Sequence, residues 1–113
     1  NAMTTPAIDI APPQTTTDIE FIVVNDEELE RPYRVIIEND DVTPMEFVIL
    51  VLLTIFELPI EHAEAIMLEA HHRGEAPVTT LPYEEARQRV YQAHSVARAA
   101  DYPLSFYLEP DNM

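Results

Sequence analysis

Apolar residues recur at every second position in some stretches of the chain and at every third or fourth in others, and these two periods predict six elements. Leu104, Phe106 and Leu108, for example, alternate with polar residues as in a half-buried strand. The predicted elements are a strand over residues 32–38, a helix over 43–56, a helix over 60–73, a strand over 76–81, a helix over 82–101 and a strand over 103–109. The predicted order is β-α-α-β-α-β, in one small domain.

Proline, glycine and capping residues set the predicted helix boundaries. Thr43, Pro44 and Glu46 form the capping-box arrangement, with a threonine N-cap, a proline at the first helical position and a glutamate at the third. Pro59 separates this helix from the next, because the residue before a proline avoids the α region. Gly74, the one glycine in the chain, is predicted to end the second helix.

Residues 1–31 are predicted to precede the folded domain, which is expected to span residues 32–113. From residue 4 to residue 31, seven acids accompany one arginine among many threonines and prolines, a composition typical of a flexible extension. Residues 1–3 read as the remnant of an expression tag. Residues 21–24, Phe-Ile-Val-Val, are apolar and β-prone, so this segment is expected to dock on the domain.

The charge of the chain is strongly negative. Six arginines and no lysine accompany 21 acidic residues, which gives a formal net charge of −15 at pH 7. Nucleic acids and anionic membrane surfaces need a basic stripe on their partner and are therefore excluded. Such a field attracts cations instead, including the ammonium group at the N-terminus of a polypeptide.

The sequence also bears on the cellular compartment. Cysteine is absent, which excludes disulfides and thiol catalysis and fits a reducing compartment. The longest apolar run, residues 47–53, is much shorter than the roughly 18–20 residues that span a bilayer. No secretory signal or transit peptide is visible, so the sequence favours the bacterial cytoplasm, with the plastid stroma as the alternative.

Two motifs, in the same order and at the same separation along the chain as in the family, resemble the ClpS family of Clp protease adaptors. Residues 39–48, NDDVTPMEFV, look like the signature segment of that family, and residues 66–74, IMLEAHHRG, resemble its second motif. The similarity extends over residues 32–109. It implies a domain of the α+β class, with a three-stranded antiparallel sheet packed against three helices, and no cofactor. It further implies an adaptor of the N-end rule that recognises N-degrons beginning with Leu, Phe, Tyr or Trp and delivers them to a Clp AAA+ unfoldase, of ClpA or ClpC type, with ClpP.

The resemblance also assigns roles to single residues. Asn39, Asp40 and His71 match the positions that hold the α-ammonium group of the substrate, and Asp41 matches a position near its second residue. The positions that form the hydrophobic pocket of the family are matched by Thr43, Met45, Val48, Met67, Ala70 and Leu104. Glu84 and Arg89 match positions on the surface that contacts the unfoldase. The acidic extension resembles segments that engage the unfoldase pore.

These residue types also suit such a site on physical grounds. Met45 and Val48 lie three apart on one predicted helix, while Met67, Ala70 and His71 share one face of the next. An ammonium group offers three donors and no acceptor, so an amide oxygen, a carboxylate and a neutral imidazole nitrogen can together satisfy it. Methionine adapts to both aliphatic and aromatic partners.

Several positions depart from the family pattern. Val42 stands where an aromatic residue or histidine is usual, and Ala70 stands where a β-branched residue is common. The smaller Ala70 enlarges the pocket floor, so we expect aromatic first residues to be preferred over leucine. Leu50 and Leu53 make the first helix apolar nearly all round, so residues 21–24 or a second copy, through weak self-association, are expected to cover them.

Two other functional classes compete with the adaptor. An enzyme would have to use His62, His71 and His72 together with Asp40 and Asp41, but no two of these histidines share the i, i+4 spacing of a helical zinc motif. No nucleophile motif or phosphate-binding glycine loop is present either, so the chain is expected to be neither an enzyme nor a metal-binding protein. A diverged docking module that regulates a Clp chaperone without binding N-degrons is the alternative function.

Overall fold

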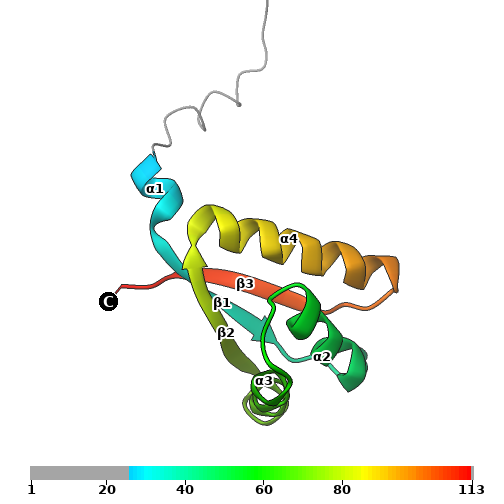
Figure 1. Ribbon diagram of the computed structural model, residues 1–113. Helices are drawn as coiled ribbons and strands as arrows, with labels where there is room; N and C mark the ends of the chain where they lie inside the picture. Colours follow the sequence, from blue (N-terminus) through cyan, green and yellow to red (C-terminus); the bar gives the residue numbers. More distant parts are fainter. Residues whose placement is uncertain (1–25, 113) are drawn as a thin grey trace, which may run out of the picture.

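A computed structural model describes residues 26–112, and within this range the chain forms a three-stranded sheet and four helices (Figure 1). The elements in chain order are α1 (Asp26–Glu30), β1 (Pro32–Glu38), α2 (Met45–Thr54), α3 (Ile60–Arg73), β2 (Glu75–Pro82), α4 (Tyr83–Ala99) and β3 (Ser105–Pro110). From β1 onward this order is the predicted β-α-α-β-α-β, so the α+β prediction is confirmed.

The sheet places β1 at its centre, with β2 and β3 paired antiparallel on either side. Because side chains alternate along a strand, Val35 and Ile37 point to the same face, where both are buried. The long helix α4 lies along this face (Figure 1). Its contacting residues include Ala86, Ala93 and Ala97, all fully buried, whose small side chains let the helix approach the strands closely.

Helices α2 and α3 pack together beside the sheet, near the end of β1 and the start of β2 (Figure 1). Gly74 ends α3 as predicted, in a left-handed conformation with φ of 93° that favours glycine. Its N–H donates to the carbonyl of Ala70 at 2.8 Å, and its own carbonyl accepts from the N–H of Asn39 at 2.9 Å. This second bond joins the loop after β1 to the last turn of α3.

The capping box predicted at Thr43 is wrong. The N-cap of α2 is Pro44, which makes no side-chain capping bond, and its carbonyl accepts the N–H groups of Phe47 and Val48, each at 3.1 Å. The hydroxyl of Thr43 instead donates to Oδ2 of Asp40 at 2.9 Å. The threonine therefore belongs to the loop that precedes the helix.

Helix α1 is an addition to the predicted elements, because its residues were assigned to the flexible extension. Its single apolar residue, Leu29, is half-buried and lines a groove shared with α4, which explains why no amphipathic pattern indicated a helix. The predictions for residues 1–3 and 21–24 lie outside the described residues.

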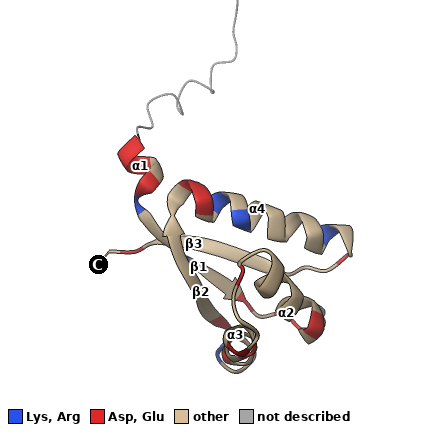
Figure 2. Cartoon of the chain, viewed as in Figure 1, with Lys and Arg blue, Asp and Glu red and all other residues tan. Residues whose placement is uncertain are grey.

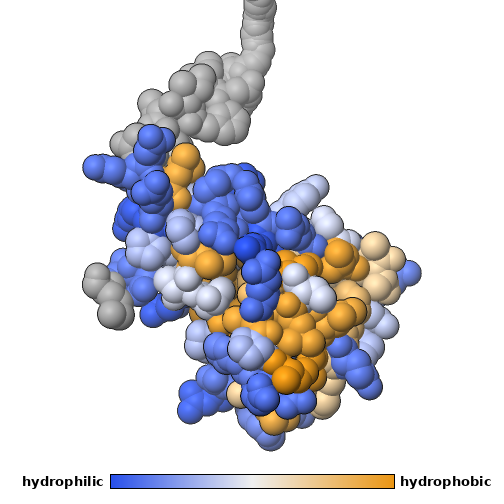
Figure 3. Space-filling model, viewed as in Figure 1, coloured by the Kyte–Doolittle hydropathy of each residue, from blue (hydrophilic) through white to orange (hydrophobic). Residues whose placement is uncertain are grey.

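The apolar character of α2 is visible at the surface. Leu50 is 53% exposed and Ile60, at the start of α3, is 43% exposed, whereas Leu53 is partly buried. Figure 3 shows an apolar area on this side of the molecule, around α2 and its connection to α3. Within residues 26–112, no helix has both the length and the apolar character that crossing a membrane requires. Cover of this face by residues 21–24 or by a second copy stays a prediction.

Candidate functional site

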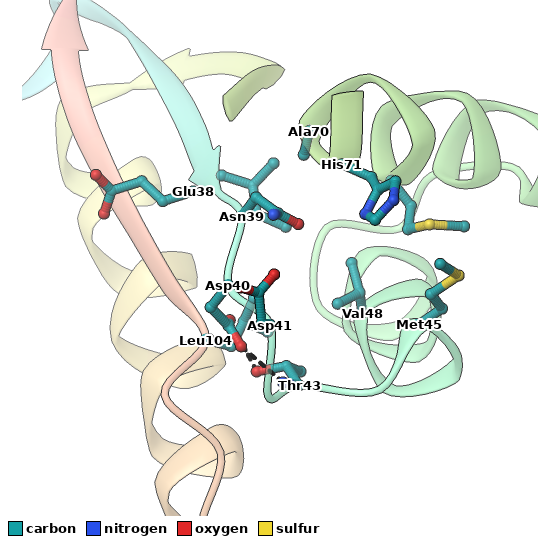
Figure 4. A pocket seen from close by; sticks show the side chains of 12 residues that line it. Glu38, Asn39, Asp40, Asp41, Thr43, Met45, Val48, Ala70, His71 and Leu104 are labelled. Atoms are coloured by element: carbon teal, nitrogen blue, oxygen red, sulfur yellow. Dashed lines mark hydrogen bonds between the residues drawn. The ribbon is translucent and has the colours of Figure 1, made fainter. Parts of the chain in front are cut away.

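A cavity of about 160 Å³ opens between the end of β1, α2, the last turns of α3 and the segment before β3 (Figure 4). Its lining consists of Ile37, Glu38, Asn39, Asp40, Asp41, Thr43, Met45, Val48, Met67, Ala70, His71 and Leu104. The structure thus brings together all ten residues that the sequence analysis assigned to the α-ammonium site, the hydrophobic pocket and the second-residue contact. These residues come from three segments that are far apart along the chain, residues 39–48, residues 67–71 and Leu104.

Polar groups gather at the mouth of the cavity. The side chains of Asn39 and His71 approach the opening from opposite sides, one from the loop after β1 and the other from α3 (Figure 4). Both residues are exposed, and Asp40 next to them is half-buried. The hydrogen bond between Asn39 and Gly74 holds the two backbone segments in this arrangement. The mouth therefore offers amide, carboxylate and imidazole groups to a donor-rich ligand.

Asp40 organises the loop between β1 and α2. Its Oδ1 accepts from the N–H groups of Val42 at 2.8 Å and Thr43 at 2.6 Å, while its Oδ2 accepts from the Thr43 hydroxyl. A carboxylate has about four lone-pair sites, so Oδ2 can accept one further donor. The loop thus fixes the carboxylate at the mouth of the cavity and leaves it able to bind.

These contacts lower the pKa of Asp40. Partial burial on its own raises the pKa, but the N–H groups of Thr43 and Val42, the Thr43 hydroxyl and the charge of Arg98 together bring it below the ordinary value of 3.8. A pKa lowered on folding means that the ionised carboxylate stabilises the fold above that ordinary value and loses this contribution as the pH falls through it. Asp40 is therefore an anion at neutral pH.

The base of the cavity is apolar. Leu104 is 1% exposed, Ala70 3% and Val48 9%, whereas Met45 at the rim is 48% exposed and free to adapt. An apolar cavity of roughly 150 Å³ in another protein is large enough to bind benzene. The volume and lining here fit a single bulky apolar side chain.

Two lining residues were missed by the sequence analysis. Ile37 was predicted only as part of a strand, although strand alternation places it on the buried face two residues before Asn39. Glu38 follows it, and its side chain points away from His71 (Figure 4). The position of both residues at the end of β1 was the signal that could have identified them.

Glu84 and Arg89, the predicted unfoldase contacts, lie away from the cavity on the first half of α4, where acids are followed by arginines (Figure 2). Both line a groove that Leu29 of α1 borders on the other side. Glu84 pairs with Arg87 at 2.7 Å on the surface.

Arg89 is only 24% exposed. Its Nη1 donates to the carbonyl of Ile55 after α2, and its Nη2 pairs with Glu85 at 3.0 Å. Arg89 thus has a structural role independent of any partner.

Replacing Arg89 with alanine is therefore expected to reduce the free energy of unfolding by about 1–2 kcal/mol, because a charged donor to a partly buried carbonyl is lost. The same change at Arg87, whose side chain is 53% exposed, is expected to cost less than about 0.5 kcal/mol. Urea unfolding of both variants measures the difference. Equal losses would contradict the structural role of Arg89.

Comparisons with known proteins point to one family. The family model for "ATP-dependent Clp protease adaptor protein ClpS" matches residues 28–107. The ATP-dependent Clp protease adapter protein ClpS of Syntrophus aciditrophicus is 42% identical over 74 residues, which cover 66% of this chain and 69% of that protein. The ClpS of Zymomonas mobilis is 43% identical over 79 residues, or 70% of this chain and 74% of that protein.

A solved structure is similar as well. Agrobacterium tumefaciens ClpS2 bound to L-phenylalaninamide superposes with a TM-score of 0.70 at 33% sequence identity, covering 73% of this chain and 99% of that one. The family match includes every residue that lines the cavity.

Proposed function

This chain belongs to the ClpS family of Clp protease adaptor proteins, and from that premise we propose that its cavity binds the N-terminal residue of substrate proteins. The ligands are N-degrons whose first residue is Leu, Phe, Tyr or Trp. The protein then delivers these substrates to a Clp AAA+ unfoldase for degradation by ClpP. In this role the chain binds and transfers substrates without catalysing a reaction itself.

The observation that carries the proposal is the division of the cavity into a polar mouth and an apolar base. In an N-terminal residue the α-ammonium group and the side chain are attached to the same Cα, so a site that binds the residue must accommodate both together. Asn39, Asp40 and His71 supply acceptors for the three ammonium donors, while Val48, Ala70 and Leu104 receive the side chain. An acidic molecule also attracts the cationic ligand.

The ligand of the structural neighbour has the same two parts. L-phenylalaninamide combines a free α-amino group with a phenyl ring and ends in an amide, as the first residue of a peptide does. It was bound by Agrobacterium tumefaciens ClpS2. The similarity of the two chains supports the assignment of the same ligand class to this cavity.

Delivery requires a second surface. We assign it to the exposed first half of α4, with Glu84 as the contact that is free of a buried structural role and Arg89 beside it. The partner would be an unfoldase of ClpA or ClpC type, and the site of action the bacterial cytoplasm. The acidic charge of α1 next to this groove adds to its attraction for a basic partner surface.

Fluorescence anisotropy with short labelled peptides tests the peptide-binding function directly. Peptides that begin with Phe, Tyr, Trp or Leu are expected to bind, and the same Phe peptide with an acetylated N-terminus is expected to bind at least about 100-fold more weakly. Acetylation removes the charge and two of the three donors, and each charge-assisted hydrogen bond contributes roughly 1.5–3 kcal/mol.

A peptide that begins with Val serves as a second control, because its short side chain leaves much of the apolar base unfilled. Equal binding of the acetylated and free Phe peptides would contradict recognition of the α-ammonium group. Failure of a folded protein to bind any of the peptides would favour a docking module that regulates a Clp chaperone.

A further inference from the structure

The segment that joins α4 to β3 is held by two side chains from the last turns of α4. Nη1 of Arg98 donates to the carbonyls of Tyr102 at 2.9 Å and Leu104 at 2.8 Å. Nε2 of His94 accepts from the backbone N–H of Phe106 at 2.9 Å. We call His94 and Arg98 the α4 clamp, since together they bond the backbone at both ends of this segment and at Leu104 within it.

The clamp holds a wall of the cavity. Leu104 lies between the backbone groups that the clamp contacts, and its buried side chain lines the base of the cavity. Regular pairing to β1 begins only at Ser105, so Leu104 itself has no strand neighbour to fix it. The charge of Arg98 also acts on Asp40 at the mouth. The α4 clamp therefore acts on both the apolar base and the polar mouth, although neither of its residues lines the cavity.

The bond from His94 depends on its protonation. An imidazole nitrogen accepts a hydrogen bond only when it carries no proton, and a protonated ring would present a donor to the donor of Phe106. Desolvation by burial, and next the charge of Arg98, lower the pKa of His94 below its ordinary value of 6.5. Within the described residues, Arg98 is the one charged group that acts on this ring, and the group facing it from β3 is Phe106, which has no charge.

The sign of the pH effect follows from this shift. A histidine pKa that is lowered on folding favours the neutral ring in the folded state, so the unfolded chain binds more protons just below pH 6.5. The contribution of His94 to the free energy of unfolding is complete above that pH and is lost as the pH falls below it. In the folded protein the wall around Leu104 should loosen only when the His94 ring takes up its proton, at a pH below the ordinary value of 6.5.

We propose that His94 and Arg98 are positioning residues for the ligand pocket, and that protonation of His94 releases the Leu104 wall and weakens ligand binding. The inference rests on the proposed function in that it takes this cavity as the peptide site. Neither residue touches the cavity itself. Their effect on affinity is exerted through the backbone of residues 102–106.

The decisive experiment compares wild type with His94→Gln, whose amide oxygen can accept the same bond but does not titrate. The dissociation constant of a Phe-initiated peptide is measured in steps from pH 7.5 down to the lowest pH at which both proteins stay folded. The wild-type affinity is expected to fall about fivefold further than that of His94→Gln, because only the wild type loses the acceptor. Both proteins share every other histidine, so the contribution of those residues divides out of the comparison.

Two further variants define the result. His62→Gln, an exposed histidine near the start of α3, is the matched control and is expected to keep the wild-type pH profile. His94→Ala leaves the Phe106 N–H without an acceptor and is expected to bind about fivefold more weakly than wild type at pH 7.5, with His94→Gln restoring most of that loss. Thermal unfolding at each pH shows whether each variant is folded there, and only folded proteins are compared.

A readout without peptide separates this inference from the proposed function. The Leu104 methyl resonances of the free protein are expected to shift with the titration of His94 in wild type and to stay constant in His94→Gln. The proposed role of the α4 clamp would be contradicted if the affinities of the two proteins had the same pH dependence. It would also be contradicted if the Leu104 methyl resonances did not change with pH in wild type. A different result is a wild type that binds no peptide while its Leu104 methyl resonances still shift with the titration of His94. That result would contradict the proposed function but support the role of the α4 clamp.

Discussion

Replacing Asp40 with alanine is expected to weaken binding of a Phe-initiated peptide at least about 100-fold, the largest loss from any single change at the mouth. Two losses combine in this variant. The ammonium group loses its one anionic acceptor, and the loop loses three hydrogen bonds from Val42 and Thr43. Anisotropy measures the affinity, and urea unfolding measures the accompanying loss of stability.

Asp40→Asn separates the two losses. The amide oxygen can still accept from the N–H groups of Val42 and Thr43, so the free energy of unfolding is expected to change by less than about 1 kcal/mol. The charge is gone, however, and affinity is still expected to fall about tenfold or more. Asp41→Asn removes the same charge one residue away and is the matched control, with an expected loss of only a fewfold. Equal losses for the two asparagine variants would show that the net charge, and not the position of Asp40, determines affinity.

Replacing Ala70 with valine is expected to reverse the preference among first residues. Ala70 is 3% exposed at the floor of the cavity, so two added methyl groups occupy space that an aromatic ring would fill. Overpacking of this kind costs roughly 1–3 kcal/mol, which corresponds to a loss of about 5- to 150-fold for peptides that begin with Phe or Trp. A leucine peptide is expected to lose little, because its side chain is smaller. Anisotropy with peptides that differ only at the first residue measures the ratio.

The matched control is Ala65→Val, on the same helix but on its exposed side. It carries the same cost in helix propensity and is expected to leave the ratio of Phe to Leu binding unchanged. If wild type already binds the leucine peptide as tightly as the Phe peptide, Ala70 does not set the preference for aromatic residues.

The order and ends of the elements were predictable because their signals are local. Pro59 precedes the first residue of α3 as its N-cap and Gly74 ends that helix, each through its own backbone geometry, whatever the rest of the chain does. Period-two and period-3.6 patterns likewise report which side chains must be buried. The short helix α1 was missed because five residues with one apolar side chain carry no such period.

Thr43 shows where a local motif is ambiguous. Its spacing to Glu46 matches a capping box, in which the hydroxyl oxygen would accept from the backbone N–H of Glu46. In the structure the hydroxyl instead donates to the carboxylate of Asp40, three residues before it. The loop geometry decides between the two partners in favour of Asp40. A sequence pattern alone does not contain that geometry.

The element order, the strongly acidic composition and the residue types of the candidate site, including Asn39, Asp40 and His71, could be predicted without a structure. The order follows from periodicity, the charge from composition, and the site residues from the resemblance of two contiguous motifs to one family. Three features could not be predicted in this way: Ile37 lines the cavity, Arg89 anchors the end of α2, and His94 and Arg98 hold the segment around Leu104. The contacts of Arg89, His94 and Arg98 join a side chain to a backbone group of another segment, and almost every residue has the same backbone carbonyl and N–H, so the sequence does not distinguish one such partner from another. Which of them a side chain meets depends on how the helices pack against the sheet.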